Sequence, residues 1–328
     1  MTRLVTIFGG SGFVGRYIAR RMAQEGWRVR VAVRRPNEAI FVRPYGVVGQ
    51  VEPVFCNIRD DDSVRAVTRG ADAVVNCVGV LNEIGANKFA AVQAEGAARI
   101  ARIAAEQGVE QMVHISSIGA DRNSPSRYAQ TKAAGEEGVL AHFPRAVILR
   151  PSVIFGQEDG FFNRFAGMAQ ATPILPLVGG NTRFQPVYVD DIARAAVMGI
   201  KGEAEPGIYE LGGPEVATLR DLIGRMLRLI RRRRIVVNLP FFIGSIIGGV
   251  LDFLQIISMR LFTNSVLTRD QVQSLRRDNV VADGARGFAE LGIEPLPMEA
   301  VIGDYLWRYR PSGQYAAIKD SAQNLRGH

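Results

Sequence analysis

A tyrosine and a lysine in the middle of the chain, Tyr128 and Lys132, have the spacing of an acid–base pair. Four residues apart on a helix, their side chains lie on one face. A nearby ammonium group stabilises a phenolate, so Tyr128 would exchange protons near neutral pH. Ser117, which follows a strand-like run together with Ser116, would hold a carbonyl oxygen of a substrate. Because a Tyr-x-x-x-Lys pattern is common by chance, its meaning depends on the rest of the chain.

A glycine-rich turn near the N-terminus supplies that context. The apolar run 4–8 is followed by Gly9, Gly12 and Gly15, and a helical pattern begins at once. Glycine allows a sharp turn, lets backbone N–H groups approach a diphosphate, and lets the helix pack close to the strand. The pattern predicts a dinucleotide site, with a plain structural turn as the simpler alternative, and Lys132 could then also hold the nicotinamide ribose. The residues expected at the diphosphate are Gly9, Ser11, Gly12, Phe13, Val14 and Gly15.

The end of the second expected strand indicates which dinucleotide would bind. A protein that reads a ribose 2′-hydroxyl usually has an acidic residue there, whereas this chain has Arg34 and Arg35. A guanidinium can hold a 2′-phosphate with two hydrogen bonds, and Arg16, directly after the glycine turn, could reach the same group. The sequence therefore favours NADP(H) over NAD(H). The alternative is two solvated arginines at the end of a strand.

Two further segments follow expected strands and should lie at the same edge of the sheet. Asn57 and Ile58 come after the third strand, where contact with the adenine edge is expected. Cys77, Val78 and Gly79 come after the fourth strand and should pass the adenine ribose.

Apolar strand-like runs alternate with helical patterns through the first half of the chain. Strands are expected at 4–8, 28–33, 51–56, 71–77, 112–115 and 146–149, and helices at 60–69, 86–107 and 126–141. Such alternation is typical of an α/β fold with a doubly wound parallel sheet of the Rossmann type.

Beyond residue 150 the pattern is less regular. A strand at 184–189, a helix at 190–200, a strand at 207–211 and a helix at 217–230 are expected there. We predict an NADP(H)-binding domain over 1–150, to which 183–200 returns, and a smaller, partly interleaved C-terminal α/β domain over 151–310. Residues 311–328 are polar and aperiodic and are expected to form a tail.

The composition limits the partners and the compartment. Of 328 residues, 40 are Lys or Arg and 32 are Asp or Glu, and the net charge of +8 favours phosphates, an anionic membrane surface or an acidic protein face. No nucleic-acid module is apparent, and three scattered histidines predict no metal site. Cys56 and Cys77 end apolar runs and are expected to be reduced core residues. No signal peptide is expected, because the chain enters its first strand directly.

The stretch 235–262 is unusually apolar and follows four consecutive arginines, Arg231–Arg234. A helix from Pro240 to about residue 258 would be ~28 Å long, which is marginal for a ~30 Å hydrocarbon core. Polar residues such as Asp252 also interrupt the run, so we predict no transmembrane span. Two alternatives remain: a helix buried in the smaller domain, or an apolar docking helix on a membrane surface or a membrane protein.

Several local patterns together resemble the extended, atypical short-chain dehydrogenases/reductases over most of the chain. They are the glycine turn, the His-Ile-Ser-Ser run that ends at Ser117, Tyr128 to Lys132, Arg150 to Gly156, Val187 to Asp191 and Tyr209 to Pro214. Within that family the chain is most similar to the nucleotide-binding accessory subunits of respiratory complex I in their bacterial form. The closer likeness rests on 116–121 with 126–128, on 151–159 and on 267–272.

This resemblance implies a tightly held, structural NADPH and no catalysis by the chain itself. It implies other subunits of complex I as partners, and a peripheral position on the cytoplasmic face of the inner (plasma) membrane, near the quinone site. Residues 235–262 and the arginine run would dock onto the partners and the anionic membrane surface. Ser116, Pro151 and Val153 join the expected nucleotide contacts. Where active relatives often carry Asn in the helix after the fourth strand, this chain has Gln93, which puts the proton relay of an active enzyme in doubt.

Two other hypotheses stay open. The intact Ser117, Tyr128 and Lys132 favour a soluble NADP-dependent reductase or a sugar-nucleotide epimerase/dehydratase. The third and weaker hypothesis is a redox-sensing binding protein that reports NADPH through a partner. A sugar-nucleotide enzyme needs polar and basic groups in a pocket facing Tyr128, and 235–262 offers few.

Overall fold

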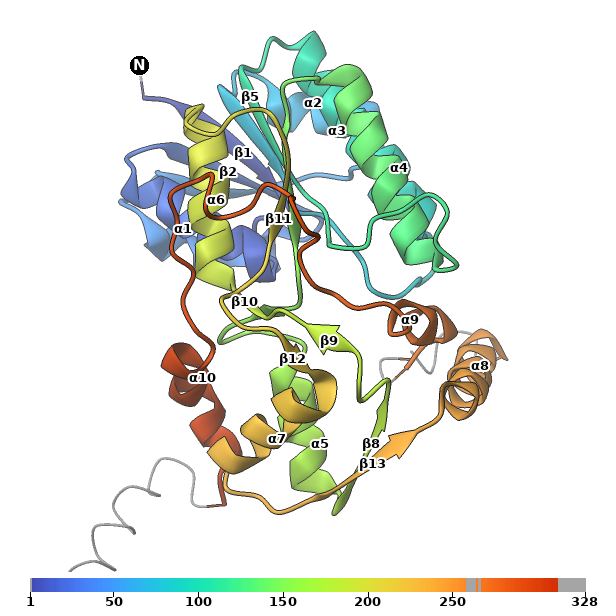
Figure 1. The fold of residues 1–328 in the computed structure, drawn as a ribbon. Coiled ribbons are helices and arrows are strands. Elements are labelled where there is room, and N and C mark those ends of the chain that lie inside the picture. Colours follow the sequence, from blue (N-terminus) through green and yellow to red (C-terminus); the bar gives the residue numbers. More distant parts are fainter. Residues whose placement is uncertain (1, 258–263, 265–266, 312–328) are drawn as a thin grey trace, which may run out of the picture.

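The computed structural model describes residues 2–257, 264 and 267–311, and its centre is a seven-stranded parallel sheet (Figure 1). The strands of this sheet are β1 (Leu4–Phe8), β2 (Arg28–Val33), β3 (Val51–Phe55), β4 (Ala73–Asn76), β5 (Gln111–Ile115), β6 (Val147–Pro151) and β11 (Gly207–Leu211). Their order is β11-β6-β5-β4-β1-β2-β3, so the direction of winding reverses between β1 and β4. In open parallel sheets, ligands bind outside the carboxyl ends of the strands at such a reversal.

Helices cover both faces of the sheet, and each face has its own apolar core. The helices of this layered part are α1 (Phe13–Gln24), η1 (Pro36–Tyr45), α2 (Asp61–Thr68), the π-helical turn η2 (Ala90–Ala94), α3 (Glu95–Glu106), α4 (Arg127–His142) and α6 (Val189–Lys201). Helices α1 and α6 pack on one face, and α2, α3 and α4 cover the other (Figure 1). Ile7 and Phe8, neighbours on β1, are both fully buried but belong to opposite cores, as the alternation of side chains along a strand requires.

A smaller lobe is built from the second half of the chain around a third apolar core. Its elements are β7 (Ile154–Phe155), α5 (Phe162–Ala171), β8 (Ile174–Val178), β9 (Arg183–Phe184), β10 (Val187–Tyr188), β12 (Ala217–Thr218), α7 (Leu219–Leu229), β13 (Ile235–Leu239), α8 (Phe241–Ile257), α9 (Arg269–Ser274), α10 (Glu299–Leu306) and η3 (Trp307–Tyr309). Phe162 of α5, Leu222 of α7 and Ile302 of α10 meet in this core. Helix α6 and strand β11 also come from the second half of the chain, but they belong to the larger lobe, which contains the seven-stranded sheet.

The parallel α/β sheet expected from the sequence is confirmed, but two of the expected elements differ and one strand was not expected. The strand predicted at 184–189 is wrong: Pro186, which has no N–H to donate, lies between two short strands, β9 and β10. The helix predicted from residue 86 starts only at η2, because Ile84 and Asn87 exchange backbone hydrogen bonds in a turn. The beginning of the apolar stretch, β13, is a strand that pairs in parallel with β8.

Helix α8 packs through small residues and exposes large ones. A Cβ on Gly244 would lie 2.7 Å from Val178 Cγ2, and one on Gly248 would lie 2.8 Å from the backbone nitrogen of Arg269. The exposed apolar side chains of the helix are Phe242, Ile246, Ile247, Val250, Phe253, Leu254 and Ile257. The helix is therefore not buried in the smaller lobe, which removes one of the two alternatives drawn from the sequence. Within the residues that the structure describes, no helix is long and apolar enough to cross a membrane.

Candidate functional site

The glycine turn joins β1 to α1 beside the reversal of the strand order. Gly9 has φ +74°, which L side chains rarely adopt, and its N–H donates to the carbonyl oxygen of Ala32 on β2 at 2.9 Å. A Cβ on Gly15 would overlap the Gly9 carbonyl oxygen and lie 2.7 Å from Gly10 Cα. Glycine at both positions is what allows α1 to start this close to the end of β1.

The first turn of α1 offers backbone donors to an anion. The helix begins after Gly12 with no side-chain cap and no acidic residue in its first turn. The N–H groups of Phe13, Val14 and Gly15 therefore have no side-chain acceptor, and the helix dipole adds partial positive charge there. Backbone donors in this arrangement suit an anion such as a diphosphate.

The three arginines expected at a 2′-phosphate differ in their engagement. Arg16 donates to the carbonyl oxygens of Ser11 (3.1 Å) and Gly12 (3.3 Å) and forms an ion pair with Glu158 (3.3 Å). Arg35 forms an ion pair with Glu38 at 2.9 Å. Arg34 is exposed at the end of β2, and no other described residue engages its guanidinium. Of the three, Arg34 is the one that a phosphate could bind without displacing another partner.

The segment after β4 is pressed against the glycine turn. A Cβ on Gly9 would lie 3.2 Å from Val78 Cγ2 and 3.3 Å from the carbonyl carbon of Cys77. Asn76 fixes this segment, because its Oδ1 accepts a hydrogen bond from the Val78 N–H at 3.0 Å. Burial raises the pKa of the Cys77 thiol to about 12, so Cys77 is a neutral thiol and not a nucleophile.

Asn57 and Ile58 lie at the carboxyl end of β3, two strands away from β1. The Asn57 N–H donates to Ser63 Oγ at 2.9 Å, and Arg99 donates to the Ile58 carbonyl oxygen at 3.1 Å. Ile58 also packs under α3, where a Cβ on Gly96 would lie 2.8 Å from its Cδ1. These contacts hold the pair rigidly at the edge where an adenine ring is expected.

Lys132 connects the helix that carries Tyr128 to the ends of β4 and β5. The Lys132 side chain is buried, and its Nζ donates to the carbonyl oxygen of Ile115 at 3.1 Å. The same Nζ lies 6.0 Å from the centroid of the Tyr128 ring, and a Cβ on Gly79 would lie 3.5 Å from it. Phe89 packs edge-on against Tyr128, with 5.9 Å between ring centroids. The structure thus brings together the expected residues from three separate segments.

The hydroxyl groups of Ser116 and Ser117 are buried and have no hydrogen-bond partner among the described residues. Buried polar groups are rarely left unpaired in native proteins. Both residues follow β5, beside the end of β6. Two unpaired hydroxyls at this edge are what a site that holds a polar ligand would show.

His114 supports this region from inside the sheet. Its Nδ1 lies 3.1 Å from Asn76 Nδ2, so it accepts from the same Asn76 that holds Val78. Burial, with a smaller effect of the Lys132 charge, lowers the pKa of His114 to about 3. The imidazole is therefore neutral at physiological pH.

Gln93 has a hydrogen bond at each end of its side-chain amide. Its Nε2 donates to the Val80 carbonyl oxygen at 2.7 Å, and its Oε1 accepts from Thr131 Oγ1 at 2.9 Å. It lies on the π-helical turn η2 and ties the segment after β4 to α4. This arrangement holds the loop after β4 in place against α4.

Pro151 and Val153 lie at the end of β6, next to Ser116 and Ser117. The Pro151 carbonyl oxygen accepts from the Ile118 N–H at 3.0 Å, and the Val153 carbonyl oxygen accepts from the Val187 N–H at 3.0 Å. Their backbone thus joins the serine segment to β10, at the junction of the two lobes.

One residue at the site was not found by sequence reasoning. Asp270 of α9 caps α4, the helix that carries Tyr128 and Lys132, although 142 residues separate it from Tyr128. The local signal is a capping box, Thr268 with Gln271, which marks the start of α9. Asp270 lies between these two residues, and nothing in the sequence indicates that its side chain would reach α4.

The comparisons with known proteins agree with this geometry. The model of the NAD dependent epimerase/dehydratase family matches residues 5–212, a range that includes every expected site residue. The chain belongs to this family. Among solved structures of similar fold, dTDP-glucose 4,6-dehydratase of Bacillus anthracis in complex with NAD has a TM-score of 0.70 at 15% identity and covers 94% of this chain and 96% of that one. The doubly wound sheet is thus the Rossmann-type fold of the family.

Proteins similar to this chain over most or part of its length carry different names. The protein named NADH dehydrogenase (ubiquinone) 1 alpha subcomplex subunit 9, mitochondrial, of Arabidopsis thaliana is 35% identical over 316 residues, which is 94% of this chain and 79% of that protein. Ceramide reductase of Caulobacter vibrioides is 33% identical over 194 residues, 59% of this chain and 60% of that protein. The family resemblance drawn from the sequence patterns is confirmed.

Proposed function

We propose that the chain is an NADPH-holding, non-catalytic accessory subunit of the proton-pumping NADH:quinone oxidoreductase, respiratory complex I. It would stabilise the peripheral arm near the quinone site, on the cytoplasmic face of the membrane. The Arabidopsis relative, which matches over nearly the whole of this chain, supports this class of protein.

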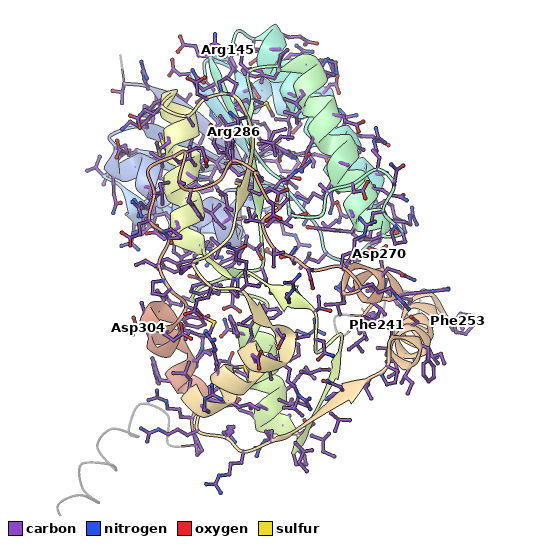
Figure 2. All side chains as sticks on the ribbon, viewed as in Figure 1. Arg145, Phe241, Phe253, Asp270, Arg286 and Asp304 are labelled. Atoms are coloured by element: carbon purple, nitrogen blue, oxygen red, sulfur yellow. The ribbon has the colours of Figure 1, made fainter. Side chains whose placement is uncertain are left out.

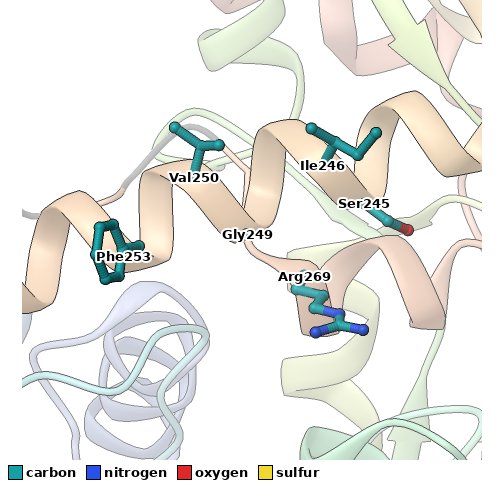
Figure 3. A pocket seen from close by; sticks show the side chains of 6 residues that line it. All are labelled: Ser245, Ile246, Gly249, Val250, Phe253 and Arg269. Carbon is teal, nitrogen blue, oxygen red and sulfur yellow. The ribbon is translucent and has the colours of Figure 1, made fainter.

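The observation that carries the proposal is the outer face of α8. Seven large apolar side chains lie exposed on one helix, while Gly244 and Gly248 of the same helix face the protein. A shallow groove of about 430 Å³ runs along it, lined by Ser245, Ile246, Gly249, Val250, Phe253 and Arg269 (Figure 3). Exposed apolar surface of this extent is typical of a protein or membrane interface. Arg269 at the groove and Arg231–Arg234 supply positive charge for an anionic membrane surface.

The site residues fit an NADPH. The first turn of α1 would hold the diphosphate, Arg34 the 2′-phosphate, and Lys132 with Tyr128 the nicotinamide ribose. When bound, the cofactor can supply a hydride. In the proposed subunit the cofactor instead serves as a structural ligand, and its binding stabilises only the folded chain.

The test is purification from native membranes under mild conditions. We expect the chain to migrate with a large respiratory assembly and to release about one NADPH on denaturation, and this NADPH should not be oxidised during quinone turnover. Tyr128→Phe should leave the quinone reductase activity of the assembled complex nearly unchanged. Loss of electron transfer in that variant, with normal assembly, would contradict a non-catalytic role.

A second candidate is an NADP-dependent reductase, or a sugar-nucleotide epimerase or dehydratase, acting as a separate soluble protein. The grouping of Ser117, Tyr128 and Lys132 around one edge of the sheet favours it. A chain that purifies alone and exchanges NADP(H) readily would support this candidate over the first.

A further inference from the structure

We infer that Asp270 couples the nucleotide site to the docking helix α8, so that NADPH binding and the seating of α8 on its partner strengthen each other. This inference rests on the proposed function for the identity of the nucleotide. It goes beyond that function, because a structural cofactor and a docking surface need not communicate.

The first link is between α9 and α4. The Asp270 carboxylate accepts hydrogen bonds from Ser126 Oγ (2.8 Å), the Arg127 N–H (2.7 Å) and the Tyr128 N–H (3.2 Å). These donors are the N-cap and first turn of α4, where a negative charge also meets the positive end of the helix dipole. Figure 2 shows Asp270 where α9 meets the end of α4. One carboxylate thus fixes the start of the helix that presents Tyr128 and Lys132.

The second link joins α8, α9 and Asn264, which lies between them in the chain, to the loop after β4. Asn82 donates to the Asn264 carbonyl oxygen at 2.9 Å and accepts from Gln271 at 3.2 Å. Gln255 of α8 donates to the carbonyl oxygen of Glu83 at 3.2 Å. This loop begins with Cys77–Gly79, which lies against the glycine turn and Lys132. Helices α8 and α9, together with Asn264, therefore hold two sides of the nucleotide site.

The third link makes α8 and α9 one unit. Asp252 of α8 accepts from the Arg269 N–H at 3.0 Å and from Asn264 Nδ2 at 2.7 Å. Gly248 lies directly beneath the start of α9, where a Cβ would meet Thr268 and Arg269. The exposed face of α8 is thus separated from the α4 N-terminus by two short, hydrogen-bonded contacts.

The coupling follows from two states of this unit, packed against α4 or detached from it. With its apolar face uncovered, α8 has few buried contacts, so the unit belongs to the part of the molecule that opens most easily. A partner on α8 favours the packed state, and NADPH on α4 and the loop favours the same state. By thermodynamic linkage, each must then raise the affinity for the other by the same factor.

Hydrogen–deuterium exchange of the free, full-length chain with and without NADPH tests the inference. We expect NADPH to slow exchange at least fivefold in α8 and α9, which do not contact the nucleotide, as well as in residues 9–16. Asp270→Asn should keep the protection at 9–16, lose it in α8 and α9, and weaken NADPH binding five- to tenfold. The matched control is Asp278→Asn, whose carboxylate binds the Arg183 backbone and side chain at 2.8 Å and makes no contact with α4.

The outcomes separate this inference from the proposed function. Protection at 9–16 with unchanged exchange in α8 and α9 of the wild-type chain would overturn the coupling and leave the NADPH-holding role intact. Failure of NADPH to protect any segment would overturn the proposed cofactor role, and the coupling with it. The wild-type measurement decides between these two results even if Asp270→Asn fails to fold. If Asp270→Asn and Asp278→Asn lost protection in α8 and α9 equally, the coupling could not be assigned to Asp270.

Discussion

Gly15 packs directly against the carbonyl oxygen of Gly9, with no room for a methyl group between them. Gly15→Ala should therefore push α1 away from the turn, lower the free energy of unfolding by about 1–3 kcal/mol, and weaken NADPH binding at least tenfold. Calorimetric titration and urea unfolding measure the two effects. The control is Gly167→Ala in α5, where a Cβ meets nothing within 4 Å; because alanine favours helix, it should stabilise the chain by up to about 1 kcal/mol. Unchanged binding in Gly15→Ala would refute the diphosphate cradle.

Arg34 and Arg35 are adjacent but should contribute unequally to the choice of cofactor. Arg34→Gln should weaken NADPH binding about tenfold or more, the worth of a charge-assisted hydrogen bond, and leave NADH binding unchanged. Arg35→Gln should have a much smaller effect, because the Arg35 guanidinium already pairs with Glu38. Affinities for both nucleotides, measured for both variants, would show the reverse order if Arg35 were the phosphate ligand.

The outer face of α8 should determine attachment and contribute little to folding. Ile246 and Phe253 are 62% and 60% exposed, so the double variant Ile246→Asp/Phe253→Asp should keep the thermal stability of the free chain. Its attachment to membranes or to the respiratory assembly should fall about a hundredfold, since each lost apolar contact costs about 1–2 kcal/mol. Val48→Asp changes an exposed valine far from α8 in the sequence and should attach normally. Equal attachment of the double variant and the wild type in flotation assays would exclude α8 as the docking surface.

His114 should make the fold sensitive to mild acid. Burial holds its pKa at about 3 in the folded chain, whereas an unfolded histidine titrates near 6.5. Below pH ~6.5 His114 binds a proton in the unfolded chain but not in the folded chain. The free energy of unfolding therefore falls as the pH decreases, by about 2 kcal/mol between pH 7 and pH 5. Between pH 7 and pH 5 the His114→Gln variant should therefore lose about 2 kcal/mol less stability than the wild type. Urea unfolding at both pH values measures this difference. His142→Gln, at an exposed position, should behave as the wild type; a parallel decline in all three proteins would show that His114 is not the cause.

The first half of the fold could be predicted because local patterns determine it. Strands β1 and β2 match the expected ranges residue for residue, and the glycine turn lies where its spacing required. The start of η2 could not be predicted, because the turn at Ile84 and Asn87 interrupts a segment whose composition favours helix. Strand β13 could not be predicted for a different reason: it pairs with β8, a segment about 60 residues earlier in the chain.

At the site, sequence patterns predicted which residues gather and missed what holds them. Tyr128 and Lys132 share a helix face by periodicity alone, but the cap on that helix comes from Asp270, in a segment with no regular pattern. The ion pair between Arg16 and Glu158 likewise joins α1 to the loop after β7, about 140 residues further along the chain. Such long-range partners follow from the assembled structure and leave no periodic trace in the chain.

The apolar face of α8 also has a consequence for how much of this protein a cell can tolerate. A copy without its partner would carry an uncovered hydrophobic stripe, and such copies are prone to self-association or to removal by proteases. Under the proposed function, surplus synthesis would therefore yield no stock of free subunits. The number of assembly sites would set the amount of the protein, and the helix that anchors the chain would also act as the mark by which unassembled copies are cleared.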